Sequence, residues 1–224
     1  MAFDLFHGSE RIIIKPEYGV GKLHNDYGRG FYCTEDFELA AEWAVDVSRD
    51  GYVNRYSMDT SGLKMLDLNS SEYTVLHWLA ILINNRYFEL NSALSREAFR
   101  YLSEHFLTDI SGYDLIKGYR ADDSYFSFAQ DFLNNQISIS QLNRALKLGD
   151  LGEQIMLRSK KAFDRIEYTG SSSVSSAEWF LRKQARDNHA RQEYRRMNKE
   201  KYISGELYMI RIIDEGVEPD DTRL

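Results

Sequence analysis

The sequence predicts an α+β fold in one globular unit, and three observations lead to this prediction. Residues 3–7 alternate in side-chain character with the two-residue period of a strand, and residues 52–58 and 63–68 do the same on either side of a turn. Residues 35–49 instead carry apolar side chains at helical spacing. The 224 residues are 43% hydrophobic, which is enough to bury a core.

The remaining elements follow from the same two periodicities. Further strands are predicted at 113–118 and 154–159, and further helical patterns at 126–133, 140–148, 160–166 and 177–201. Three helices are expected to begin at polar N-caps, namely Thr34, either Ser70 or Ser71, and Ser95.

These elements define the expected domain organisation. Residues 1–169 form one domain, and residues 177–224 form a helical extension packed on the same domain. The Ser-rich residues 170–176 between them are expected to be a flexible loop.

The charge and cysteine content narrow the classes of function. With 28 basic and 35 acidic side chains the net charge is −7, which argues against a nucleic-acid footprint over the whole surface. Cys33 is the only cysteine, so an intrachain disulfide and a thiolate zinc site are excluded. The histidines show no metal-ligand spacing, so no metal is expected. The N-terminus has no basic and apolar leader pattern, so we expect a cytoplasmic protein without a membrane segment.

One segment is locally basic. Residues 182–201 hold eight Lys or Arg side chains against three acids. Such a run is either a solvated helical face or a surface for nucleic acid or a partner protein.

Two glycine-containing motifs carry the clearest functional signal. Residues 5–9 (LFHGS) place His7 at a strand end, before a glycine that allows another group to approach the backbone. Residues 26–34 (DYGRGFYCT) combine an acid, two glycines and an aromatic pair. Taken alone, these motifs also fit a strand-end histidine and a simple turn, and Trp43 on the following Ala-rich helix also fits a core residue.

In this order, and followed by Ala-Ala-Glu-Trp, the motifs resemble the NAD-binding half of the ADP-ribosyltransferase fold, on its diphtheria-toxin and poly(ADP-ribose) polymerase side. The chain is more closely similar to a bacterial domain family of unknown function in that clan, because 113–118 (YDLIKG), 121–123 (ADD) and 153–155 (EQI) follow in the family's order. The resemblance spans residues 3–168. It implies a split antiparallel β-sheet core with helical insertions and a C-terminal helix.

The resemblance also implies roles for individual residues. His7 would hydrogen-bond a ribose hydroxyl of NAD, and the Gly8 backbone would hold the nicotinamide carboxamide. Tyr32 would stack on the nicotinamide ring, and Trp43 would supply a second ring. The other implied NAD-binding positions are Ser9, Gly30 and Asp122.

Two positions depart from the family pattern. Ala40 stands where related polymerases carry a serine that holds the carboxamide. The catalytic glutamate that opens a late strand is matched by Gln154, with Glu153 beside it, and on a strand only one of the two can enter the site. A glutamine can bond the ribose 2′-hydroxyl but cannot act as a base, which disfavours polymer synthesis.

The function implied by the resemblance is that of a mono-ADP-ribosyltransferase that uses NAD as co-substrate and releases nicotinamide. Its acceptor would be a protein or a nucleic acid, and a toxin or defence effector with an antitoxin or other partner protein is the implied biological role. The alternative is a catalytically silent NAD- or nucleotide-binding module in which Gln154 replaces the catalytic glutamate.

Overall fold

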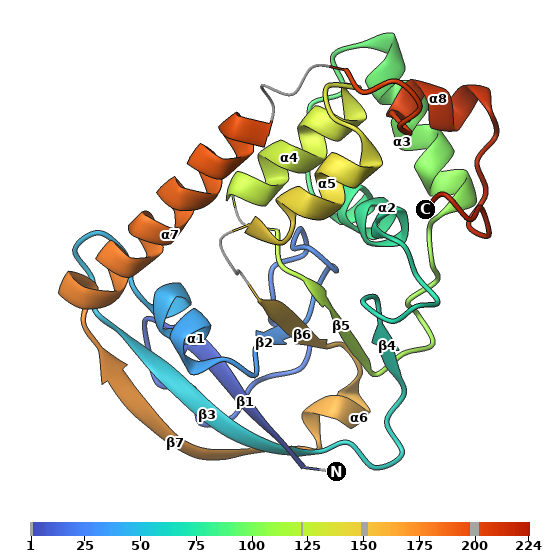
Figure 1. Cartoon of the computed structure of the whole chain (residues 1–224). Helices are drawn as coiled ribbons and strands as arrows, with labels where there is room; N and C mark the ends of the chain where they lie inside the picture. Colours follow the sequence, from blue (N-terminus) through green and yellow to red (C-terminus); the bar gives the residue numbers. More distant parts are fainter. Residues whose placement is uncertain (1, 122, 149–151, 198–201) are drawn as a thin grey trace.

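The computed structural model describes residues 2–121, 123–148, 152–197 and 202–224, and it shows a mixed α+β fold with two β-sheets (Figure 1). One sheet has the order β1-β3-β7 and the other the order β2-β6-β5-β4. The strands are β1 (Ala2–Ser9), β2 (Phe31–Cys33), β3 (Gly51–Asp59), β4 (Met65–Asp67), β5 (Leu115–Tyr119), β6 (Glu153–Leu157) and β7 (Ile166–Val174).

The two sheets meet where β1 passes β2. Phe6 and Thr34 exchange both backbone hydrogen bonds in an isolated antiparallel bridge. The expectation of antiparallel pairing is correct for every described strand pair except β4 and β5, which pair in parallel. Parallel neighbours need a long crossover, and the chain makes it through two helices.

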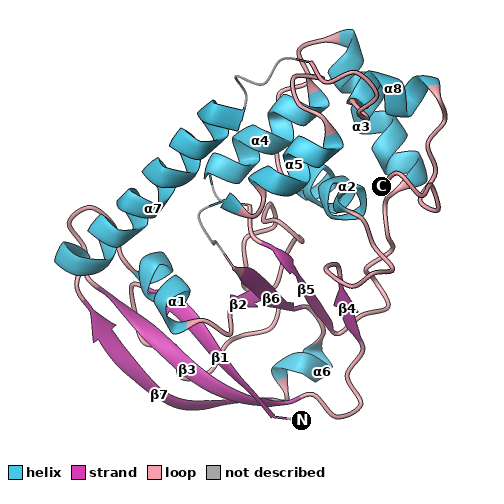
Figure 2. Ribbon diagram, in the orientation of Figure 1, coloured by secondary structure: helices cyan, strands magenta, loops and turns pink. Residues whose placement is uncertain are grey.

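The helices gather mainly on one side of the four-stranded sheet, while the long α7 runs from the end of β7 towards α4 (Figure 2). Their bounds are α1 (Phe37–Ala44), α2 (Val75–Asn85), α3 (Ala93–His105), α4 (Asp123–Leu133), α5 (Ile139–Ala145), α6 (Lys160–Phe163), α7 (Ser176–Met197) and α8 (Met209–Asp214).

The predicted N-caps lie within a few residues of the true ones but are wrong in identity. The side chain of Asp36 caps α1 by accepting from two backbone amides of the first turn, and Thr74 caps α2. Ser92 caps α3, while the predicted Ser95 is the third helical residue and returns the other half of the capping box. Polar residues adjacent in sequence all suit a cap, so local pattern does not choose among them.

The Ser-rich segment is the clearest correction to the sequence prediction. Residues 170–174 belong to β7, which pairs with β3 from Ile166 to Val174, and they do not form a loop. Strand pairing is made by backbone groups, so a run of small exposed serines can pair at a sheet edge despite its low β-propensity.

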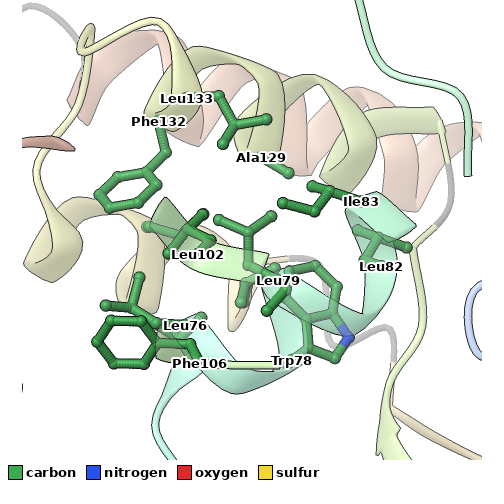
Figure 3. Close-up of a cluster of buried hydrophobic side chains, with 14 of the residues drawn as sticks. Leu76, Trp78, Leu79, Leu82, Ile83, Leu102, Phe106, Ala129, Phe132 and Leu133 are labelled. Carbon is green, nitrogen blue, oxygen red and sulfur yellow. The ribbon is translucent and has the colours of Figure 1, made fainter. Parts of the chain in front are cut away.

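The largest core packs α2 against α3 and α4. Figure 3 shows Leu76, Leu79 and Leu82 of α2 among side chains such as Leu102 of α3 and Phe132 of α4. Side chains from the end of the chain belong to the same core: Tyr194, Met197, Leu207, Met209, Ile212 and Val217. The C-terminal segment is therefore part of the same folded unit as the helices before it.

Candidate functional site

A cavity of about 560 Å³ opens between β2, β6, α1 and α7, which is within the size range of small-molecule sites. Three of the predicted site residues, each from a different element, line it together: Tyr32, Trp43 and Gln154. The other lining residues are Lys22, Asn25, Asp26, Arg86, Arg120, Ala121, Phe180, Lys183, Gln184 and Asp187.

Asp26 is the buried acceptor at the floor of the cavity. Its Oδ1 forms an ion pair with Arg86 at 2.9 Å, and its Oδ2 accepts from the Ala121 backbone N–H at 2.9 Å and from Gln154 Nε2 at 2.8 Å. Its side chain is only 3% exposed. A buried carboxylate is retained at low cost only when it is paired and hydrogen-bonded, and Asp26 meets both conditions.

Gln154 and Glu153, the two candidates for the position of the catalytic glutamate, point to opposite faces of β6, as adjacent residues of a strand do. Gln154 faces the cavity and is 3% exposed, whereas Glu153 points away and binds Lys117 and Asn69. Gln154 Nε2 donates to Asp26 Oδ2 and also to the Tyr119 carbonyl at 3.2 Å. Both partners are acceptors, so the amide is oriented with its nitrogen towards them.

Tyr32 is fixed by the glycine turn that precedes it. Its hydroxyl donates to the Gly28 carbonyl at 2.7 Å and accepts from the Tyr27 backbone N–H at 3.0 Å. Gly28 has φ of +83°, which favours glycine, and a Cβ on Gly30 would lie 2.5 Å from Met156. Gly30 does not line the cavity with Tyr32. The motif is therefore both a turn and one wall of the cavity.

Trp43 lies on α1 with Arg120 over its ring, the guanidinium carbon 5.0 Å from the ring centroid. Its buried Nε1–H has no hydrogen-bond partner among the described residues. One face of this ring is thus occupied by a cation, and the indole N–H is a buried donor without an acceptor among the described residues.

His7 does not line the cavity, but it contacts Tyr32, which does. Its Nδ1 lies 2.6 Å from the Tyr32 carbonyl oxygen, so Nδ1 carries the proton and donates, and Nε2 is left as the acceptor. Burial lowers the pKa of His7 more than this hydrogen bond raises it, which favours the neutral ring.

Gly8 and Ser9 also lie outside the cavity, in contacts that the sequence did not reveal. A Cβ on Gly8 would lie 1.9 Å from the Ala40 carbonyl oxygen, so Gly8 allows α1 to pack directly on β1. Ser9 Oγ donates to the Arg11 carbonyl and accepts from Asn54. The predicted Asp122 lies outside the described residues.

The sequence did not reveal the cations of the site. Lys22, Arg86, Arg120 and Lys183 line the cavity against two carboxylates, Asp26 and Asp187, which leaves an excess of two positive charges. Asp26 stands at the head of the glycine motif and could have been singled out by that position. The cations come from unrelated segments and carry no sequence signal.

The basic stretch is mostly neutralised within the protein. Four arginines of α7 form ion pairs with carboxylates: Arg182, Arg186, Arg191 and Arg196. Lys183 and Arg195 are the basic side chains of the described α7 with no ion pair to another described residue. This pattern favours a helix packed on its own protein over an exposed phosphate-binding face.

Other kinds of site are not seen in the part of the chain that the structure describes. No group of three or more His, Cys, Asp or Glu side chains there is arranged to hold a metal ion. Cys33 is buried, and burial raises the pKa of its thiol, which disfavours the thiolate. None of the described helices is long and apolar enough to span a membrane.

A family model matches residues 3–168, and its description is "Protein of unknown function (DUF3990)". No curated protein and no solved structure matches the chain.

Proposed function

The chain belongs to the DUF3990 family, and from the cavity itself we propose that it binds NAD and transfers ADP-ribose to a macromolecular acceptor. The observation that carries this proposal is the convergence of Tyr32, Trp43 and Gln154 on one cationic cavity. These positions come from β2, α1 and β6, far apart in sequence. They are also the positions that the resemblance to ADP-ribosyltransferases assigns to ring stacking and to the ribose.

The chemistry of the lining suits a dinucleotide. Aromatic rings can stack on flat heterocycles, and an excess of cations attracts a phosphate-bearing ligand. Trp43 Nε1–H, which has no described partner, offers a donor to a ligand oxygen. A cavity of about 560 Å³ holds a ligand of this class at least in part.

The reaction breaks the bond between ribose C1′ and the nicotinamide nitrogen and forms one between C1′ and the acceptor atom, whose proton passes to solvent. Positive charge builds on C1′ as the bond breaks, so the site must orient the ribose and stabilise a cation. The Gln154 amide oxygen would accept from the ribose 2′-hydroxyl, and the nearby Asp26 carboxylate is the fixed negative charge of the floor. His7 and Gly8 lie outside the cavity, so in this proposal they support the site, His7 by donating to the Tyr32 carbonyl and Gly8 by allowing α1 to pack on β1.

The test is to incubate the protein with NAD labelled in its adenylate and with a cell lysate, and to measure both label in macromolecules and free nicotinamide. Tyr32→Ala and Trp43→Ala are expected to weaken NAD binding about tenfold or more, since each loses a stacking ring. Tyr87→Ala is the matched control, because Tyr87 is 85% exposed and lies outside the cavity. Wild-type protein that binds NAD but neither transfers label nor releases nicotinamide contradicts the transferase proposal.

A silent NAD-binding module is the second candidate, and the Gln154–Asp26 hydrogen bond favours it. An amide committed to a structural carboxylate cannot supply the charge of a catalytic glutamate. If Gln154→Ala lowers transfer strongly with NAD affinity kept within a few fold, the enzyme is supported. If the wild-type protein binds NAD but neither transfers ADP-ribose nor releases nicotinamide, the silent binding module is supported.

A further inference from the structure

Helix α7 forms one complete side of the cavity. Phe180, Lys183, Gln184 and Asp187 line it, and their spacing of three, one and three residues places them on one helical face. This helix begins at Ser176, beyond residues 3–168 of the family match. The cavity is therefore completed by a segment outside the part of the chain that the family model matches.

The helix is held firmly against α1. Arg186 donates to both carboxylate oxygens of Glu42 on α1, and the two side chains are only 16% and 9% exposed. At the helix start, the Ser176 backbone N–H donates to Asp50 Oδ1 and the Ser176 hydroxyl donates to the Asp46 carbonyl. A bidentate, largely buried Arg–carboxylate pair fixes orientation, so the cavity face of α7 is preorganised.

Two of the cavity's four cations have no ionic partner among the described residues. Arg86 is paired with Asp26, and Arg120 lies over Trp43. Lys22, from the loop before the glycine motif, and Lys183, from α7, make no ion pair or hydrogen bond with any described residue. Cations that line a cavity with no partner of their own are suited to an anionic ligand.

We propose that Lys22 and Lys183 together bind the diphosphate of the nucleotide ligand, so that α7 determines which anionic ligands the site accepts. The proposal rests on the proposed function for the identity of that ligand. A nucleoside diphosphate unit carries at least two negative charges, which matches two unpaired lysines. Lysine binds phosphate as a mobile point charge, without the fixed fork of arginine, so both side chains can follow a flexible diphosphate.

The experiment compares four ligands by calorimetry on the full chain: NAD, ADP-ribose, ADP and nicotinamide riboside, which lacks phosphate. Lys22→Ala and Lys183→Ala are each expected to weaken binding of ADP, ADP-ribose and NAD about tenfold or more, since each removes a charge-assisted contact. Binding of nicotinamide riboside is expected to stay unchanged. The losses shrink at high salt, because exposed charges are screened.

Matched controls are Lys15→Ala and Arg195→Ala, which remove exposed cations that lie outside the cavity and make no ion pair or hydrogen bond with any described residue. Lys183→Arg keeps the charge and is expected to retain most of the ADP affinity, whereas Lys183→Glu is expected to lose more than Lys183→Ala. Unchanged denaturant midpoints for these variants show that the fold is kept.

Each outcome separates this inference from the proposed function. Lysine-dependent binding of ADP without binding of NAD supports the diphosphate site and contradicts the NAD proposal. If the affinity for NAD is unchanged in both Lys22→Ala and Lys183→Ala, the diphosphate site is overturned and the NAD proposal stands. Equal losses for nicotinamide riboside, or no binding of ADP by the wild-type protein, also overturn it.

Discussion

Gln154 Nε2 donates to Asp26 Oδ2 at 2.8 Å, across a gap of 128 residues in sequence, and this bond forms the floor of the cavity. The bond requires a donor at 154, because the Asp26 oxygen is an acceptor that also receives the Ala121 N–H. The resemblance assigns position 154 to a catalytic glutamate. In this chain the position holds a glutamine, whose amide N–H donates to the adjacent Asp26 carboxylate.

The first prediction concerns the substitution of Gln154 by glutamate, the residue that the resemblance to ADP-ribosyltransferases implies at this position. Gln154→Glu places two carboxylates in contact and removes both donated hydrogen bonds, so it is expected to lower the free energy of unfolding by about 3 kcal/mol at pH 7. The like charge raises the pKa of the new carboxyl above that of the unfolded chain. The loss is therefore full above the raised pKa and disappears as the pH falls towards about 4.

Denaturant unfolding from pH 4 to pH 7 measures this effect. Gln192→Glu on the exposed face of α7 is the control and is expected to be nearly neutral. If the Gln154→Glu protein is as stable as the wild type at pH 7, the hydrogen bond from Gln154 to Asp26 does not contribute to stability as proposed.

The second prediction separates the ring of Tyr32 from its hydroxyl. Tyr32→Phe loses the acceptor for the Tyr27 N–H and is expected to cost about 1–3 kcal/mol of stability while NAD affinity changes less than about threefold. Tyr32→Ala loses both. Tyr87→Phe, at an exposed position, is the control. If the Phe and Ala variants lose NAD affinity equally, the ring does not stack on the ligand.

The third prediction concerns Gly8, whose missing side chain allows α1 to pack on β1. Gly8→Ala is expected to destabilise the fold by roughly 1–3 kcal/mol or more, because the new Cβ would lie 1.9 Å from the Ala40 carbonyl oxygen and 2.7 Å from the Ala44 nitrogen. Gly112→Ala, where no atom lies within 4 Å, is the control. Equal unfolding midpoints for the two variants would show that α1 does not depend on this contact.

The fourth prediction is a dependence of stability on pH that runs through His7. Burial lowers the pKa of His7 below 6.5, so the unfolded chain binds more protons as the pH falls through that value. Its contribution to stability is full above pH 6.5 and is lost as the pH falls towards the lowered pKa, by at most about 1.4 kcal/mol per pH unit.

The His7→Gln variant is expected to show a shallower slope of unfolding free energy between pH 7 and pH 5. Some slope persists, because the pKa of His77 is lowered as well. Burial lowers the pKa of His77 more than its hydrogen bond with Thr74 raises it. Slopes that coincide in the two proteins contradict the prediction.

Local pattern was sufficient where a single segment carries the information. Alternation predicted β1, β3 and β4, helical spacing predicted α1 and α7, and the two-residue period of a strand separated Gln154 from Glu153. It failed for residues 170–174, because the pairing of β7 with β3 depends on a partner more than a hundred residues away. It failed also for the helix caps, where several adjacent polar residues are equally suitable.

The sequence by itself determined the α+β class, the family and three side chains of the cavity, because periodicity and short motifs are local properties. Only the tertiary structure decided that Asp26 holds Gln154, that His7 binds the Tyr32 carbonyl outside the cavity, and that Lys22 and Lys183 line the same cavity. These relationships join residues up to 161 positions apart, as for Lys22 and Lys183. Contacts of this kind arise from the packing of whole elements, which no single segment encodes.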